Sequence, residues 1–193
     1  MKIILVIFVL FFSSSVFADD ISDFQIEGIS VGDSLLDYYS EKEILSNKVN
    51  QDYKNDKFSF IAFWLNDSQI YERIKFGVET KDKDYIIHQI SGFIFYDNDI
   101  KSCYNQKDLI VKDLSLLLKK SEIFDEGIVT HEADPSGEST DNTVYFYYDS
   151  NDNIKVSCVD WSTRITKEKG WADNLKVVIA NSKIVDWFIN EAY

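Results

Sequence analysis

The stretch Tyr85-Ile-Ile-His-Gln-Ile-Ser-Gly-Phe-Ile-Phe-Tyr96 is the longest β-like run in the chain, and it decides the fold. A strand that is apolar on both sides is covered on both faces, so we expect this strand in the middle of a sheet. Its apolar side chains are Ile86, Ile90, Ile94 and Tyr96 on one side and Tyr85, Ile87, Phe93 and Phe95 on the other.

A long amphipathic helix is expected directly after this strand. Apolar side chains recur at helical spacing over residues 100–120, and Lys119 and Lys120 stand at the C-terminal end, where the helix dipole favours cations. Further strands are expected at residues 58–65, 71–80, 128–132, 143–149, 154–161 and 175–180. The pattern predicts an α+β fold: a largely antiparallel sheet of about six strands, the long helix packed on one face, and short N- and C-terminal helices.

Residues 1–18 have the pattern of a secretory signal peptide. Lys2 is followed by an apolar stretch over residues 3–12, and small residues precede a cleavage position after Ala18. This stretch is shorter than the ~20 residues that span a bilayer, and no other stretch of the sequence approaches that length. We therefore expect residues 19–193 to form a single exported domain, periplasmic or secreted, with no transmembrane segment after cleavage.

The net charge of the chain limits the classes of molecule that it can bind. Asp and Glu number 33 against 20 Lys and Arg, which gives a net charge of −13. Nucleic-acid binders neutralise phosphates with Lys and Arg, so the acidic balance argues against nucleic acid as a partner. The remaining candidates are an unknown small ligand or a protein of the cell envelope.

Two cysteines, Cys103 and Cys158, are the only ones in the chain. In an exported chain a disulfide is the default pairing. Cys103 falls in the first turns of the predicted long helix, and Cys158 shares one face of a predicted strand with Ile154 and Val156. We therefore predict a Cys103–Cys158 disulfide that ties the helix to the sheet.

No motif in the sequence assigns a catalytic residue, a metal site or a cofactor. Gly28-Ile-Ser-Val-Gly32 matches the nucleophile elbow G-x-S-x-G, but no buried strand precedes it, so a turn before a capped helix is favoured. The two histidines, His88 and His131, are too few for the three or four ligands of a zinc site. His88 lies within a strand, where a hydrogen-bonded structural role is expected.

One surface is a candidate ligand site by topology. If the three strands between residues 128 and 161 form a meander, the connections 133–142 and 162–174 emerge at the same end of the sheet. Aromatic surface beside a few polar groups is the usual make-up of a ligand site; the alternative is two polar connecting loops with Trp161 in the core. We expect the two loops to lie side by side and Trp171 to be partly exposed. The residues gathered there would be His131, Asp134, Asp160, Trp161, Arg164 and Trp171.

Four segments carry a resemblance: Ile26-Glu-Gly-Ile-Ser-Val-Gly-Asp-Ser-Leu-Leu36, Ser91-Gly-Phe-Ile-Phe-Tyr96, Cys103-Tyr104 and Val156-Ser-Cys-Val-Asp-Trp161. They resemble a class of small exported proteins from low-GC marine bacteria, and this resemblance implies no activity. Separately, Gly28-Ile-Ser30 followed by two short helices and three strands is similar in outline to the α-α-β-β-β fold of the BamE/SmpA and β-lactamase-inhibitor-like proteins. This similarity covers residues 26–96. The chain lacks the lipid-bearing Cys and the Leu-Gly-x-Pro turn of the BamE group, so the similarity implies a fold rather than a role in outer-membrane assembly.

The sequence favours a non-enzymatic binding or interaction module. One alternative is an enzyme whose site lies at loops 133–142 and 162–174, for which turnover would disappear on changing His131 or Asp134. The other is a structural or assembly protein of the envelope, which would co-purify with a membrane complex.

Overall fold

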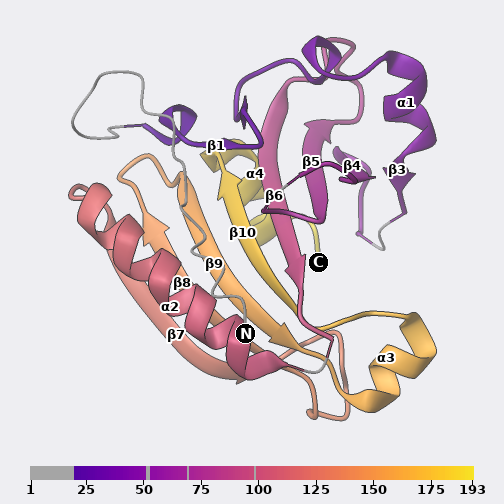
Figure 1. The fold of residues 1–193 in the computed structure, drawn as a ribbon. Coiled ribbons are helices and arrows are strands. Elements are labelled where there is room, and N and C mark those ends of the chain that lie inside the picture. Colours follow the sequence, from indigo (N-terminus) through magenta and orange to yellow (C-terminus); the bar gives the residue numbers. More distant parts are fainter. Residues whose placement is uncertain (1–19, 51–52, 69, 98) are drawn as a thin grey trace.

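The computed structural model describes residues 20–50, 53–68, 70–97 and 99–193, so the predicted signal peptide lies outside the described residues. In these ranges the chain forms an antiparallel sheet of eight strands, a separate two-stranded sheet and four α-helices (Figure 1). The large sheet has the order β3-β4-β5-β6-β10-β9-β8-β7. Its strands are β3 (Lys48–Val49), β4 (Phe58–Trp64), β5 (Arg73–Glu79), β6 (Ile87–Phe95), β7 (Glu122–Thr130), β8 (Thr140–Tyr147), β9 (Asn153–Asp160) and β10 (Asn174–Ala180).

The strand β6 lies in the interior of the sheet, as its two-sided apolar pattern predicts. It pairs with β5 on one side and with β10 on the other, and all of these pairings are antiparallel. Ile90 stands between Phe76 of β5 and Ile179 of β10, and it is fully buried. The strand β10 comes from near the end of the chain, so the centre of the sheet joins segments far apart in sequence.

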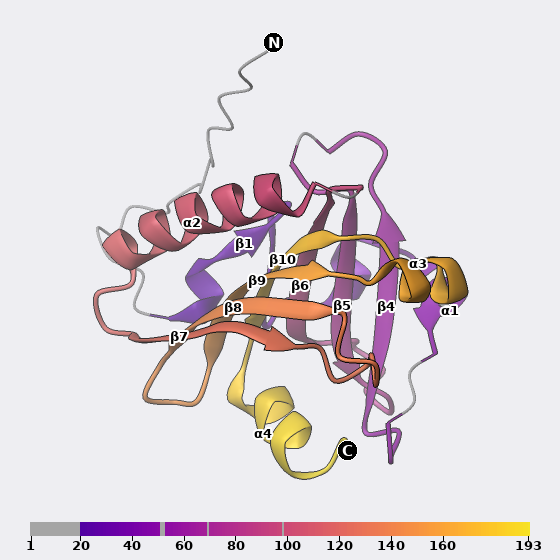
Figure 2. The same cartoon turned by 90° about the horizontal axis from the view of Figure 1, so that it is seen from below.

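The two faces of this sheet are covered by different helices. The long helix α2 (Ile100–Leu117) lies on one face, across β9 and β10, and α4 (Ser182–Asn190) lies on the other (Figure 2). We call these the α2 face and the α4 face. No helix in the described ranges is both long enough and apolar enough to cross a membrane.

The α2 face carries the main hydrophobic core. Ile110 and Leu114 of α2 pack with Val156 of β9 and with other apolar residues of the central strands. Cys103 and Cys158 form a disulfide, with their Cα atoms 6.0 Å apart, inside the ~4.4–6.8 Å range of bonded cysteines. The predicted disulfide between helix and sheet is therefore confirmed.

The N-terminal elements complete the α2-face core. Apolar residues of this region, such as Ile26 and Leu35, are buried there. Ser40 and Glu43 form the reciprocal capping box that their spacing indicates, with the Ser40 amide 2.9 Å from a Glu43 carboxylate oxygen. The elements are the short 3₁₀ helices at Ile21–Asp23 and Leu35–Asp37, the strands β1 (Gln25–Ile26) and β2 (Ile29–Ser30), and α1 (Glu41–Ser46).

The α4 face has a second, smaller core at one end of the sheet. Trp187 of α4 is fully buried against Phe58 and Phe60 of β4, and its indole nitrogen donates to Asn55 Oδ1 at 2.8 Å. A Cβ on Gly77 would lie 2.7 Å from Ile184 Cδ1, so a side chain there would force the Ile184 side chain to shift. The helix α4 therefore sits close to the sheet over β4 and β5, and it leaves the rest of this face open.

The observed fold confirms the predicted α+β class but corrects its details. The sheet has eight strands rather than about six, partly because β3 is too short to give a periodic signal. Besides α2 there are three short helices, and one of them, α3 (Thr163–Lys169), replaces most of the predicted loop 162–174. The sequence signals of α3 are the N-cap Ser162 and the C-cap Gly170, which is left-handed at φ 69°. The helix buries only Ile165, so it lacks the apolar stripe by which a helix is recognised in a sequence.

Candidate functional site

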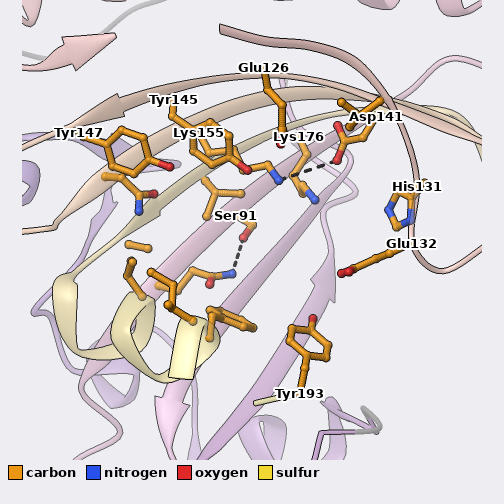
Figure 3. Close-up of a pocket in the computed structure, with 18 of the residues that line it drawn as sticks. Ser91, Glu126, His131, Glu132, Asp141, Tyr145, Tyr147, Lys155, Lys176 and Tyr193 are labelled. Carbon is orange, nitrogen blue, oxygen red and sulfur yellow. Dashed lines mark hydrogen bonds and ion pairs between the residues drawn. The ribbon is translucent and has the colours of Figure 1, made fainter. Parts of the chain in front are cut away.

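A cavity of about 610 Å³ opens on the α4 face, beside the helix. The sheet forms its floor, α4 and the C-terminal Tyr193 form one side, and β8 with the end of β7 near His131 forms the other (Figure 3). Clefts that hold small molecules have volumes of roughly 300–1,000 Å³, so this cavity has the size of a ligand site.

Three lysines project into the cavity from three different strands: Lys75 of β5, Lys155 of β9 and Lys176 of β10. Alternation along each strand sends these side chains to the α4 face, because their sequence neighbours fill the core on the α2 face. Lys75 and Lys155 occupy one cross-strand row, separated by one residue each of β6 and β10. Lys176 stands one diagonal step from Lys155, which corresponds to roughly 7–8 Å between backbones.

The surroundings of these amines disfavour their charged forms. Burial, followed by the positive charges of Lys155 and Lys75, lowers the pKa of Lys176 to about 7 even though Asp141 acts in the opposite direction. Burial, followed by the charges of Arg73 and Lys155, lowers the pKa of Lys75 to about 8. Because an ordinary lysine titrates near pH ~10.4, Lys176 is unusual in being divided between ammonium and free amine at neutral pH.

The protein itself supplies little compensation for these charges. Lys155 Nζ lies 3.8 Å from Asp141 and 5.3 Å above the ring of Tyr145. Lys75 Nζ lies 5.2 Å from the ring centre of Phe60, a cation–π contact rather than an ion pair. Across the described residues, no hydrogen bond or ion pair reaches the amine of Lys176. The floor of the cavity is therefore positively charged, in a protein whose overall charge is −13.

A buried hydroxyl without a partner among the described residues lies in the sheet next to Lys176, outside the residues that line the cavity. Ser157 is fully buried directly opposite Lys176 in the β9–β10 register, and alternation places its side chain on the α4 face. Within the described part of the chain its Oγ has no hydrogen-bond partner. An unsatisfied buried hydroxyl costs about 1–3 kcal/mol, so this polarity is not there for stability.

Tyrosines make up much of the cavity wall. Tyr145 and Tyr147 of β8 stack with their ring centres 5.3 Å apart, and Tyr53 meets Tyr193 edge-on at 5.5 Å on the opposite side. Burial, and then Glu126 and other carboxylates, raises the pKa of Tyr145 to about 12, so its phenol stays neutral at physiological pH. Acidic side chains stand at the mouth, where Glu126 and Glu132 are exposed to solvent.

The two loops of the predicted site lie together as expected, and Asp134 and Arg164 have a structural role there. The Asp134 carboxylate accepts hydrogen bonds from the amides and hydroxyls of Ser136 and Ser139 at 2.7 to 3.2 Å. It also accepts from the Ser162 hydroxyl at 2.9 Å and from the Arg164 guanidinium. These donors, Ser139 first, hold the pKa of the Asp134 carboxyl well below its usual range. Asp134 and Arg164 therefore fasten one loop to the other.

The aromatic members of the predicted site do meet. The ring centre of Trp161 lies 4.4 Å from that of His131 and 4.6 Å from that of Trp171, and Trp171 is 40 % exposed. The predicted juxtaposition of the loops and the partial exposure of Trp171 are therefore confirmed. His131 also lines the lysine cavity, and burial lowers its pKa. Asp160 shares the strand face of Cys158, on the α2 side, so it points away from the cavity.

His88 has the structural role that its position in a strand indicates. It is buried in β6, and its Nδ1 lies 2.9 Å from the Asn181 side-chain nitrogen at the start of α4. The elbow-like Ser30 is also buried, in a two-residue strand paired with β1. Neither residue reaches the cavity lining.

Sequence reasoning missed the lysines because alternating charged residues in a strand indicate a solvent-facing surface. In β5, Lys75 alternates with the buried Ile74 and Phe76, but the face on which Lys75 lies is partly closed by α4. A usable signal was present. Between their first and last residues, β5, β9 and β10 carry no charged side chain other than these three lysines, in a chain with a large excess of acid. Lysine is also depleted in strands generally.

In the described ranges, no group of three or more histidine, cysteine or acidic side chains is placed to hold a metal ion. Comparison of the chain with protein-family models, with curated proteins and with solved structures finds no match. The similarities to exported marine bacterial proteins and to the BamE/SmpA and β-lactamase-inhibitor-like fold therefore stay predictions.

Proposed function

We propose that this chain is an exported, non-enzymatic binding module that holds a small anionic ligand in the cavity on the α4 face. The observation that carries the proposal is the convergence of Lys75, Lys155 and Lys176 on one ligand-sized cavity, where, among the described residues, Lys155–Asp141 is the one ion pair that these lysines form. Like charges in a partly buried site repel, and a bound anion would reverse that cost by giving the amines a counter-charge and hydrogen-bond acceptors.

The walls support a ligand that combines an anionic group with apolar or aromatic surface. Stacked tyrosines and the apolar side of α4, including Val185 and Phe188, surround the charged floor. Ligand sites typically combine such apolar walls with a few polar groups that fix orientation.

Thermal denaturation with a matched pair of small molecules tests the proposal. Benzoate and benzamide have nearly the same shape, but only benzoate is charged. A ligand that binds the native state alone raises Tm, by an amount that grows with concentration. We expect benzoate, succinate or inorganic phosphate to raise Tm, and benzamide to leave it unchanged at the same concentration and ionic strength.

Two variants separate the cavity from general charge effects. Lys176→Met removes an amine from the cavity floor, and Lys42→Met makes the same chemical change on the exposed surface of α1. The anion-induced rise in Tm should be lost in the first and kept in the second. If no tested anion raises Tm, or if the rise is equal in both variants, the proposal fails.

A further inference from the structure

We infer that Lys176 captures carbonyl-bearing carboxylates, such as α-keto acids, as a reversible imine. The inference rests on the proposed function, because the anionic group of the ligand is what the neighbouring lysines hold. It goes beyond that function by assigning a covalent role to one amine and a chemical class to the ligand.

The geometry distinguishes Lys176 from the other two lysines. Lys155 has Asp141 at 3.8 Å, and Lys75 rests between the rings of Phe60 and Phe93 at 5.2 and 5.9 Å. Lys176 has neither kind of partner among the described residues, although it lines the same cavity. Its position on β10, inside the sheet, fixes its backbone between β6 and β9. An amine that faces a cavity from a fixed backbone position and lacks a partner among the described residues is arranged for contact with a ligand.

The chemistry of the amine agrees with that geometry. Lys176 has a pKa of about 7, lowered mainly by burial and then by Lys155, while Asp141 opposes the shift and Lys75 adds to it. A substantial fraction of free amine is present at neutral pH, and only the free amine attacks a carbonyl carbon. Lys75, whose pKa is about 8, remains largely charged there and can hold the carboxylate.

The step balances without any further reagent. The Lys176 nitrogen donates its lone pair to the carbonyl carbon, so a C–N bond forms and one bond of the C=O group breaks. The carbonyl oxygen takes up a proton and the nitrogen releases one, which gives a hydroxyl beside a neutral nitrogen. Loss of that hydroxyl with one more proton releases water, and the nitrogen gives up its remaining proton as the C=N bond forms. Lys155, one diagonal step away across the sheet, is placed to supply the proton that leaves with the hydroxyl. Addition of water reverses the sequence, so the ligand is held and released unchanged.

Reductive trapping with pyruvate tests the inference. Cyanoborohydride delivers a hydride to the imine carbon, and solvent supplies a proton to the nitrogen. The product is a stable secondary amine heavier than lysine by the mass of pyruvate less one oxygen atom. Peptide mass spectrometry should find this adduct at Lys176 well above the level at exposed lysines such as Lys42. Acetone, which has the carbonyl without the carboxylate, should label Lys176 less than pyruvate does.

Lys176→Arg separates this inference from the anion-binding proposal. Arginine keeps a positive charge but forms no imine under these conditions, so trapping should vanish. Lactate, which has the carboxylate without the carbonyl, should still raise Tm in this variant. In the unchanged protein, trapping of pyruvate should increase as the pH rises through the titration of Lys176, whereas the affinity for lactate should decrease.

The imine and the anion-binding proposal can be disproved independently of each other. If pyruvate labels exposed lysines and Lys176 equally while lactate still raises Tm, the imine is ruled out and anion binding stands. If neither compound raises Tm and Lys176 is not labelled, both proposals fall together.

Discussion

The two faces of the sheet are built from the same strands and differ in almost every other respect. On the α2 face an eighteen-residue helix, a disulfide and the N-terminal elements enclose a continuous apolar core. On the α4 face a nine-residue helix covers one end of the sheet, and three amines stand in the part beside it. The apolar face supplies the stability that allows the other face to keep charged groups in a costly position.

Breaking the α2 face should produce the largest change in stability. The Cys103→Ser, Cys158→Ser double variant removes a cross-link between residues 55 apart, which the chain-entropy model values at about 4 kcal/mol. The free energy of unfolding from urea denaturation should fall by about that amount. The anion-induced rise in Tm should survive, because the cavity lies on the opposite face. A double variant with an unchanged denaturation midpoint would show that the disulfide contributes nothing.

The second prediction concerns the α4 face alone and is the pH dependence of its affinity for an anion. An anion stabilises protonated amines, so binding raises their pKa values and must be accompanied by proton uptake above about pH 7. Affinity for benzoate should level off below about pH 6 and fall by up to about tenfold per pH unit above the pKa of Lys176. Calorimetric titration with benzoate at a series of pH values across this range measures the affinity.

The other charged groups that line the cavity with Lys176 are Lys155, Asp141, Glu126 and Glu132. Burial lowers the pKa of His131, so its imidazole carries less charge near pH 6 than an ordinary histidine does. Lys75, with a pKa of about 8, acts in the same direction as Lys176. Affinity that is constant from about pH 6 to about pH 9 would mean that the amines do not contact the anion.

Removing one amine should make the ligand-free protein more stable. In Lys176→Met the unfavourable burial of a nitrogen is replaced by apolar packing, and we expect the free energy of unfolding at pH 6 to rise by about 0.5–2 kcal/mol. The gain should shrink as the pH increases toward the titration of unfolded lysine, because both states then carry a neutral amine. Lys42→Met, on the surface, should change stability by less than about 0.5 kcal/mol. A less stable Lys176→Met protein would indicate that the amine has a structural partner.

The smallest effect is expected at the loop site that the sequence indicated. Trp171→Ala removes a partly exposed ring from the cluster with Trp161, and it should cost less than about 1 kcal/mol of stability. Affinity for benzoate should change by less than about threefold, or ~0.7 kcal/mol, because the ring is outside the cavity lining. Loss of anion binding in this variant would instead place the ligand between the loops.

These contrasts also show which parts of the molecule could be predicted. The two-sided apolar run around Ile90, the stripe of α2 and the cysteine pair give strong periodic or pairwise signals, and the structure confirms each. The loops meet at Asp134 because three strands in a meander leave little choice of geometry. The cavity could not be placed in the same way. Whether Lys75 faces water or a helix depends on where α4, over a hundred residues later in the chain, comes to rest.

The position of β10 has a consequence for how the sheet is assembled. The strands β4 to β6 form one meander and β7 to β9 another, and each is made of pairings between sequence neighbours. In the part of the chain that the structure describes, the two meanders are joined by β10 alone, close to the end of the chain. Until β10 inserts, β6 and β9 both present unpaired edges with apolar side chains, which are the kind of edge that associates with other chains. We therefore expect the last step of folding to be slow, non-local and the one most vulnerable to aggregation.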